Sequence, residues 1–310
     1  MKKVTLDLDH LLKEGSINQE EYDRLLSLSA KSTSTLAFNL LIGFGVIAVS
    51  GSALALAPTP TTSIIIGAVV LAAGIALLCN KSEQWKLLAN ILILVGALMS
   101  GGGIGAALQA HLFSFLLISL LYALSALLSK SSLLAVLSTL ALSGSIGAST
   151  GYRHASYSIM IKEPVLTVAL FSVLAILMYQ LSKIVGVEFS RLSIASARTS
   201  VFLVNFGFWI GSLWGDKIHP VGMNISATAF SVLWAVCLIL TAIWSWKANR
   251  RWVLNTVATF GAIHFYTQLF ESLGASRTTV LIAGLLALAF ALGLKEANKT
   301  LVKNTPPESA

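Results

Sequence analysis

The sequence predicts an all-α protein: a polytopic transmembrane helix bundle of about ten spans with both termini in the cytoplasm. The composition, the length of the apolar runs and the placement of the basic residues lead to this prediction. Hydrophobic residues make up 56 % of the 310 positions and charged residues 11 %, whereas a soluble domain carries about 25 % charged residues. So little charge cannot cover a surface that faces water. The net charge of +8 does not indicate nucleic acid binding, because the basic residues lie in short gaps between apolar runs.

Ten apolar runs have the length of a membrane span. Such a span needs about 20 apolar residues, and lipid offers no partner for a free backbone N–H or C=O, so each run is expected to be helical. The runs imply a cytoplasmic helical hairpin at 1–34, a transmembrane bundle at 35–296 and a disordered cytoplasmic tail at 297–310. They cover residues 36–57, 62–79, 87–105, 108–128, 133–150, 165–184, 199–215, 225–246, 252–270 and 278–294.

The basic residues give the direction of the spans. With ten spans and a cytoplasmic N-terminus, all but four of the 21 Lys and Arg residues fall in segments on the inner side. The four exceptions are Arg153, Lys162, Lys217 and Arg277. Cytoplasmic loops of membrane proteins carry an excess of Lys and Arg. This distribution therefore predicts a multi-pass membrane protein with both ends of the chain in the cytoplasm.

The first 34 residues are polar and are expected to form a helical hairpin. Residues 7–14 suit a short helix that Gly15 ends. Asn18, with Glu21 three residues later, matches the capping box that begins a second helix. A hairpin of about 25 residues is too small to be firmly stable alone. Its apolar side chains are therefore expected to dock on the bundle, a second copy of the chain or a cytoplasmic partner; they include Leu11, Leu12, Tyr22, Leu25 and Leu26.

The hairpin sequence also resembles a known family. The pattern Leu-Leu-Lys-Glu-Gly-x-Ile-x-x-Glu-Glu-Tyr at 11–22 resembles the opening of a family of predicted bacterial membrane proteins, the "domain of unknown function 2157" type. It is also similar to the short helical-hairpin module called SHOCT. The segment His-Phe-Tyr-Thr-Gln-Leu-Phe-Glu-Ser-Leu-Gly at 264–274, followed by the apolar run 280–294, resembles the C-terminal end of the first family. The resemblance implies a bacterial inner-membrane protein with a cytoplasmic hairpin, and it implies no activity.

Small residues gather in the outer halves of several predicted spans. Gly207, Gly211 and Gly215 recur at every fourth position, so that one helix face can approach another backbone closely. Gly101 and Gly105 belong to the run Ser-Gly-Gly-Gly-Ile-Gly at 100–105. This run fits tight helix packing, or alternatively a turn or unwound segment whose carbonyl groups line a central site.

A polar stripe in the ninth run is the main candidate for a binding site. His264, Gln268 and Glu271 are four and three residues apart, so they share one helix face. An intramembrane histidine that leads to a glutamate at the rim can relay protons or bind a cation. The alternative is that these side chains only hydrogen-bond to a neighbouring helix. No Asp, Glu, Lys or Arg is expected at mid-membrane, which argues against an ion-coupled transporter.

The predicted outer loops hold a second group of polar residues. Their side chains can meet over the bundle and bind an anionic headgroup or a metabolite, or they are solvated loop residues. Local metal-ligand spacing, a Gly-rich phosphate loop and a nucleophile elbow are all lacking, so we predict no enzyme activity, metal or cofactor. The two cysteines fall inside apolar runs and are predicted to act as small hydrophobic residues. The outer group comprises Arg153, His154, Asp216, His219, Glu271 and Arg277.

Two functions remain open on this basis. The first is a permease or a lipid- or small-molecule-binding membrane protein, with its site near the outer leaflet; it depends on the small-residue segments and the His264 stripe. The second is a non-enzymatic membrane scaffold or sensor whose cytoplasmic hairpin recruits a partner or a second copy of the chain. Both functions place the protein in a lipid bilayer.

Overall fold

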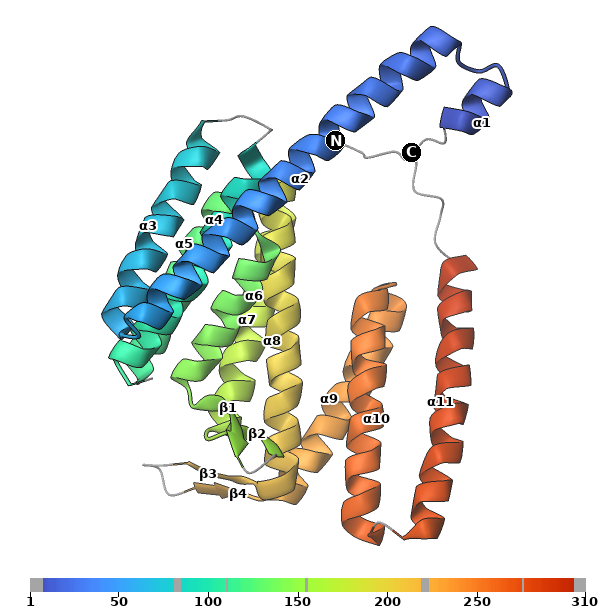
Figure 1. Cartoon of the computed structure of the whole chain (residues 1–310). Coiled ribbons are helices and arrows are strands. Elements are labelled where there is room, and N and C mark those ends of the chain that lie inside the picture. Colours follow the sequence, from blue (N-terminus) through green and yellow to red (C-terminus); the bar gives the residue numbers. More distant parts are fainter. Residues whose placement is uncertain are drawn as a thin grey trace. The chain divides into compact units, whose positions relative to one another are not determined.

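The computed structural model describes residues 8–80, 85–109, 111–153, 156–218, 223–274 and 276–303. Most of this part of the chain is helical (Figure 1), and the all-α prediction is confirmed. Two short antiparallel hairpins accompany the helices. The helices are α1 (Leu8–Lys13), α2 (Gln19–Leu56), α3 (Pro60–Cys79), α4 (Lys86–Ala107), α5 (Leu112–Ser129), α6 (Ser132–Ser145), α7 (Pro164–Ile184), α8 (Val187–Trp214), α9 (Ala227–Lys247), α10 (Arg251–Leu273) and α11 (Arg277–Lys303); the strands are β1 (Ala148–Arg153), β2 (Ser156–Ile161), β3 (Asp216–Ile218) and β4 (Met223–Ile225).

The N-terminal hairpin forms in the predicted way. After α1, Gly15 has the left-handed φ of 71° that is typical of a helix end. The Asn18 side chain accepts a hydrogen bond from the Glu21 backbone N–H at 2.7 Å, and the Glu21 carboxylate accepts one from the Asn18 backbone N–H at 3.1 Å. This reciprocal pair is the expected capping box. Helix α2 then continues to Leu56, so the hairpin and the first apolar run share one helix across residues 34 and 35.

The apolar side chains of the hairpin lie where α1 contacts the start of α2. Leu11, Leu12, Tyr22 and Leu25 are all half-buried. Leu26 falls in a stretch of α2 whose side chains lie outside the described ones. The hairpin therefore covers only part of its own apolar surface.

Within the described residues, six helices are long and apolar enough to cross a membrane: the part of α2 from Phe38 onward, and all of α3, α4, α5, α7 and α9. They coincide with six of the ten predicted spans and are compatible with a membrane protein. Helix α6 has 14 residues, so it is about 21 Å long. It is therefore shorter than the apolar core of a membrane, which is about 30 Å thick. Helices α8 and α10 are longer but carry polar side chains such as Asn205 and Gln268. Polar residues are tolerated where a helix packs against other helices, and α8 is buried along much of its length.

Two loops contain β-hairpins that the sequence analysis did not predict. The fifth predicted span ended at residue 150, but α6 ends at Ser145 and the chain enters β1 at Ala148 after Gly147, whose φ is 89°. That boundary was wrong because β1 pairs with β2 in antiparallel register, from Ala148 opposite Ile161 to Arg153 opposite Ser156. Strands β3 and β4 form a second hairpin. Local strand pairing satisfies the backbone of these loops without a helix.

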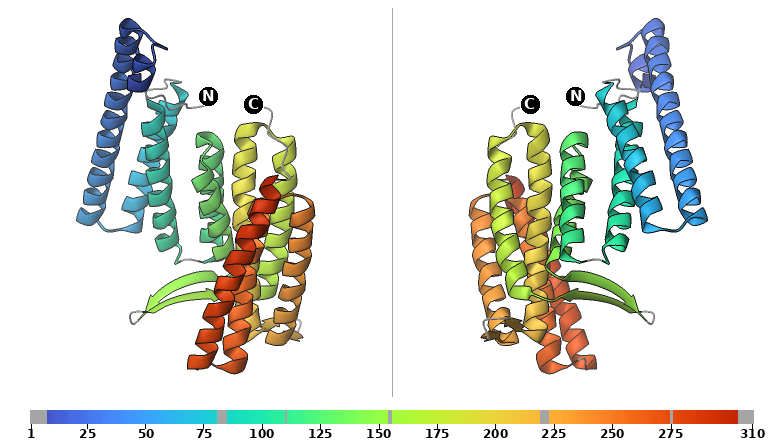
Figure 2. Two further views of the ribbon diagram at one scale, coloured as in Figure 1. Left: turned by 90° about the vertical axis from the view of Figure 1, so that its right-hand side faces the viewer. Right: turned by 90° about the vertical axis from the view of Figure 1, so that its left-hand side faces the viewer.

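The chain divides into two compact units, Met1–Ser138 and Thr139–Ala310. In the first unit, α3 and α4 run side by side (Figures 1 and 2), and glycines make their close approach possible. A Cβ added at Gly67 would lie 2.5 Å from the Ser100 backbone nitrogen, and one at Gly96 would lie 2.7 Å from the Gly67 carbonyl oxygen. The Ser63 hydroxyl also donates to the Met99 carbonyl at 2.8 Å. Small residues and one hydroxyl thus hold the two backbones together.

The run at 100–105 is neither a turn nor an unwound segment, because α4 passes through it as a continuous helix. Its glycines face different neighbours. Gly101 lies against the Tyr122 hydroxyl of α5, and a Cβ at Gly105 would make ordinary contact with Ile118 of the same helix at 3.6 Å. Gly103 faces α3, whereas a Cβ at Gly102 would meet no atom within 4 Å. Of the two alternatives for this run, the helix-packing one describes the structure.

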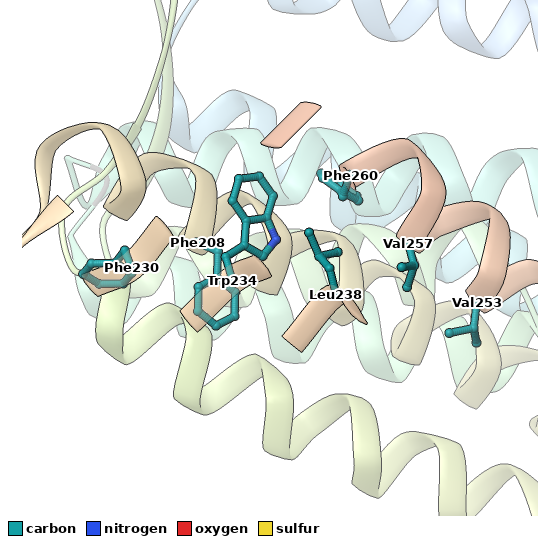
Figure 3. Packing of buried hydrophobic residues seen from close by; sticks show 7 residues of the cluster. All are labelled: Phe208, Phe230, Trp234, Leu238, Val253, Val257 and Phe260. Atoms are coloured by element: carbon teal, nitrogen blue, oxygen red, sulfur yellow. The ribbon is translucent and has the colours of Figure 1, made fainter. Parts of the chain in front are cut away.

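The second unit has an aromatic core between α8, α9 and α10. Figure 3 shows seven of its residues: Phe208, Phe230, Trp234, Leu238, Val253, Val257 and Phe260. The rings of Phe208 and Trp234 are stacked at 6.4 Å between centroids with an interplanar angle of 3°. Cys237 packs against the cluster as a small apolar side chain, and both cysteines are free thiols.

The predicted glycine ridge of α8 belongs to this core but does not form one contact face. A Cβ at Gly207 would lie 2.9 Å from the Val168 side chain of α7, whereas Gly211 lies against the Phe230 ring of α9. Gly215 follows the last residue of α8 as its C-cap with φ of 70°, so it ends the helix instead of extending the ridge. The single-face prediction was wrong for this reason, although Gly207 and Gly211 do make room for close packing.

Two glycines of α4 provide a matched pair for testing this packing. Gly96→Ala should destabilise the protein by about 1–3 kcal/mol because the new methyl group would overlap the α3 backbone. Gly102→Ala should be neutral or slightly stabilising, since its methyl group enters open space and alanine favours the helix. Apparent melting temperatures in one detergent would compare the two variants. Equal tolerance at both positions would contradict the close α3–α4 contact.

Candidate functional site

The centre of the second unit contains a buried polar pair. Trp234 of α9 is 1 % exposed, and its indole N–H donates to the Asn205 side-chain oxygen of α8 at 2.9 Å. The Asn205 amide nitrogen donates in turn to the Val201 carbonyl at 2.8 Å. A buried indole N–H needs an acceptor, and Asn205 supplies it. The pair fixes the position of the Trp234 ring among the residues of Figure 3.

His264 of α10 lies against this ring. The ring centroids of His264 and Trp234 are 4.8 Å apart, with an interplanar angle of 68°, so the two rings meet edge to face. The Nδ1 atom of His264 is shielded from solvent and has no hydrogen-bond partner in the described part of the chain. One turn further along α10, the same holds for the Nε2 atom of Gln268. The structure therefore places two of the three predicted stripe residues on a covered face, each with an unpaired nitrogen.

The neighbouring polar groups are satisfied. Trp209 of α8 donates its indole N–H to the Thr267 hydroxyl of α10 at 3.0 Å. On α10, Tyr266 donates its hydroxyl to the Ala283 carbonyl of α11 at 2.7 Å. Residues 261–270 of α10 are all half-buried, so neighbouring helices cover this stretch only in part. The unpaired nitrogens thus lie beside two half-buried polar side chains of α10, Tyr266 and Thr267, that do find partners.

Unpaired buried groups have a free-energy consequence. A buried donor or acceptor without a partner costs about 1–3 kcal/mol. Gln268 offers N–H donors, and His264 Nδ1 either donates or accepts, depending on its tautomer. A small molecule with hydrogen-bonding groups at the right separation would remove this cost on binding. We call Asn205, Trp234, His264 and Gln268 the α10 site.

The third stripe residue is separate from this site. Glu271 lies three residues beyond Gln268 and is exposed. Its side chain makes no hydrogen bond or ion pair in the described part of the chain. The predicted stripe therefore divides into a covered pair and an exposed carboxylate. The expected hydrogen bonds from His264 and Gln268 to a neighbouring helix are not observed.

Among the described residues, the members of the predicted outer group make no contact with one another that defines a site. Asp216, 7 % exposed, accepts a hydrogen bond from the Val165 backbone N–H at 2.8 Å. A carboxylate at this position satisfies an otherwise free N–H of the first turn of α7 and suits the positive end of the helix dipole. Asp216 therefore holds β3 to the start of α7 and has a structural role.

The other members of the outer group make no site that the structure describes. Arg277 begins α11 as an exposed residue, and Arg153 lies in β1 with its side chain outside the described ones. His154 and His219 lie outside the described residues altogether. Within the described residues, no three His, Cys, Asp or Glu side chains are grouped so that they could hold a metal ion.

Two tryptophans at or beside the site, Trp234 and Trp209, were not predicted as functional residues. Trp234 lies in the middle of an apolar helix, away from the ends where tryptophan usually marks a membrane interface. That position signals a buried indole that needs an acceptor, and Asn205 is an amide on another predicted span. Trp209, one turn after Asn205, carries the same signal. The pairing itself depends on which helices become neighbours, and single-helix patterns do not show that.

Comparison of the chain with protein-family models, with curated proteins and with solved structures finds no match. The fold and the site therefore define only a class: a helical protein that is compatible with a membrane, with a covered polar face in its second unit. The family resemblance of the hairpin and of the last two spans stays a prediction.

The Asn205–Trp234 pair can be tested with a double-mutant cycle. Asn205→Leu should lower stability by about 1–3 kcal/mol, because it leaves the indole N–H of Trp234 buried without an acceptor. In a Trp234→Phe background the same change should cost clearly less, since no N–H is left unpaired. Melting temperatures of the four proteins give the coupling. Additive losses would contradict the hydrogen bond. Thr267→Val, which affects the half-buried Trp209, is the control and should have the smaller effect.

Proposed function

We propose that the chain is a multi-pass protein of the bacterial inner membrane that binds a small polar molecule or a lipid headgroup at the α10 site. A permease that passes such a molecule is one form of this function. The observation that supports it is the pair of unpaired nitrogens, His264 Nδ1 and Gln268 Nε2, beside the Trp234 ring. A bound ligand that pairs with both nitrogens would offset their desolvation.

The proposed topology has ten spans with both termini in the cytoplasm. The ten helices from α2 to α11 correspond to the ten predicted spans in order, and all but four of the Lys and Arg residues then lie on one side. Inside the second unit, Arg250 reaches the ring of Tyr179, and Arg198 reaches the ring of Trp252. These contacts support placing the end of α7 and the α9–α10 turn on the same side of the membrane.

The chemistry of the α10 site favours an uncharged ligand. Among the described side chains, Asp216 is the one carboxylate or basic group that is buried, and its carboxylate already accepts a hydrogen bond from Val165. Ion-coupled carriers usually keep a charged side chain within the membrane. We therefore propose passive passage or simple binding. The ring of Trp234 suits a ligand with a flat or apolar part, and the two nitrogens suit one with neighbouring donor and acceptor groups.

A thermal-shift screen tests this proposal. The full chain in lipid nanodiscs would be heated with neutral amides, polyols, nucleobases and lipids, and tryptophan fluorescence would follow its unfolding. A ligand at 100 times its Kd should add about 2.7 kcal/mol of stability. His264→Ala and Gln268→Leu should both abolish the shift, because each removes one of the unpaired nitrogens.

Glu271→Gln is the matched control on the same helix. Glu271 is exposed, so this variant should keep the full shift. Loss of binding in Glu271→Gln would instead favour a proton or cation relay along the stripe. A ligand shift that survives in both His264→Ala and Gln268→Leu would overturn the α10 site as its binding place.

The N-terminal hairpin favours a second candidate function, a membrane scaffold or sensor. Leu11, Leu12, Tyr22 and Leu25 remain half-exposed although α1 and α2 contact each other. A partially covered apolar surface on a small hairpin suits docking of a cytoplasmic protein or of a second copy. In this function the hairpin recruits and the helices serve as its membrane anchor.

Removal of α1 separates the two functions. Deleting residues 1–17 leaves Asn18 in place to begin α2. A scaffold should then lose its partner in a quantitative pull-down, and self-association through the hairpin should disappear in size-exclusion light scattering. The ligand shift of the α10 site should be unchanged. Leu12→Glu in the full-length chain should reproduce the loss. If both the partner and the oligomeric state survive deletion, the hairpin is not the recruiting element.

A further inference from the structure

One end of the second unit carries basic side chains stacked on aromatic rings. The Nζ atom of Lys183 lies 4.5 Å from the ring centroid of Tyr179 in α7, and the Cζ atom of Arg250 lies 6.0 Å from the same centroid. The Cζ atom of Arg198 in α8 lies 5.1 Å from the ring centroid of Trp252 in α10. Such cation–π contacts hold a flexible cationic side chain in place. We call these five residues the basic aromatic surface.

A tight turn joins the two halves of this surface. Arg250 and Trp252 are two residues apart at the start of α10, and each belongs to one half. The turn before them is fixed by backbone hydrogen bonds: Ala248 N–H donates to Trp244 C=O at 2.8 Å, and Arg250 N–H donates to Ser245 C=O at 2.9 Å. The surface therefore combines contributions from three helices in a defined arrangement.

The three positive charges have no carboxylate partner. Within the described part of the chain, Lys183, Arg198 and Arg250 take part in no ion pair, and Lys183 donates only to the neutral Gln180 side chain at 3.0 Å. All three side chains are exposed. Lys183 and Arg250 share the ring of Tyr179, so their charges repel, and an anion bound beside them would relieve this repulsion. Stacking uses the flat face of a guanidinium and leaves its N–H donors free in the plane, where they can pair with phosphate oxygens in bidentate fashion.

The position of the surface indicates where the anion comes from. Among the described residues of this unit, α7 and α9 are the two helices that are long and apolar enough to cross a membrane. The basic aromatic surface lies at the end where both helices finish. Tyrosine and tryptophan are enriched at the depth of the lipid headgroups. Close by, Ile184 and Val187 are 81 % and 74 % exposed, as expected for side chains that meet lipid. A phosphate at this depth belongs to a phospholipid.

We propose that the basic aromatic surface binds the phosphate group of an anionic phospholipid. Arg198 and Arg250 provide paired N–H donors, Lys183 provides a point charge, and Tyr179 and Trp252 hold these cations in position. This inference depends on the membrane location proposed above, and it does not depend on the α10 site. Anionic headgroups are recognised elsewhere by basic side chains at the cytoplasmic ends of membrane helices.

Lipid titration of the full chain tests the proposal. The protein in phosphatidylcholine nanodiscs would receive increasing phosphatidylglycerol, and its melting temperature would be recorded at low and high salt. The wild-type protein should show a saturable upward shift that weakens with salt. Arg198→Gln and Arg250→Gln should each weaken the apparent affinity by about tenfold. Arg198→Lys keeps the charge but loses the planar fork, and it should also weaken binding.

Arg191→Gln is the matched control. Arg191 lies two turns before Arg198 on the same helix and is likewise exposed, but no aromatic ring of the described residues holds it. Arg191→Gln should retain the lipid response. Equal losses at Arg191 and Arg198 would overturn the proposal, because they would indicate a nonspecific attraction between exposed positive charges and the anionic bilayer.

Inorganic phosphate alone should give no shift of the melting temperature in phosphatidylcholine. A saturable shift with phosphate that abolishes the lipid response would show that the surface binds free phosphate and not a phospholipid. His264→Ala should leave the lipid response intact. Loss of ligand binding at the α10 site can therefore be distinguished from loss of lipid binding at the basic aromatic surface.

Discussion

Polar groups that neither water nor lipid can reach need hydrogen-bond partners within the chain, and this constraint organises much of both units, although Asn90 Oδ1 and Ser100 Oγ of the first unit have no partner in the described part of the chain. In the first unit, Ser119 of α5 and Ser138 of α6 exchange hydrogen bonds: each hydroxyl donates to the other residue's carbonyl at 2.9 Å. In the second unit, Asn205 accepts from the indole of Trp234 and Asp216 accepts from the first turn of α7. Each of these contacts joins two elements, whereas other buried hydroxyls, such as those of Ser200 and Ser245, donate to a carbonyl of their own helix.

The two units satisfy the packing requirement with different side chains. In the first unit, glycine and serine let α3 and α4 approach until their backbones touch, which increases dispersion contacts where lipid provides no hydrophobic drive for association. In the second unit, large rings fill the space between α8, α9 and α10. Large apolar side chains also point outward: Phe44 of α2 and Phe113 of α5 are each 74 % exposed. A soluble protein would bury such residues, so their exposure fits helices that face lipid.

The sequence was sufficient where the controlling interactions are local. The capping box joins Asn18 to Glu21, three residues later, and the helix end at Gly15 depends only on the backbone conformation of that one glycine. Both features were therefore predicted. The shared face of His264 and Gln268 follows from the helical period in the same way. The partner of Trp234 and the glycine contacts of α3 with α4 could not be predicted, because they depend on which helices meet. The β1–β2 hairpin was missed for another reason: residues 148–150 (Ala-Ser-Thr) follow an apolar run without a proline or a charged residue to end it, and only their pairing with β2 shows that the helix has ended.

His264 and Gln268 are informative because they break the constraint that their neighbours obey. Thr267 lies between them on α10 and accepts a hydrogen bond from Trp209. Tyr266, on another side of the same turn, reaches the Ala283 carbonyl of α11. The helix is thus positioned so that its polar side chains can pair, and a general looseness of packing does not explain the two exceptions. A polar group that stays buried and unpaired lowers stability, and such a loss is tolerated most readily where function uses the group. The unpaired nitrogens of His264 and Gln268 therefore favour a ligand for the second unit over a purely structural role for its polar face.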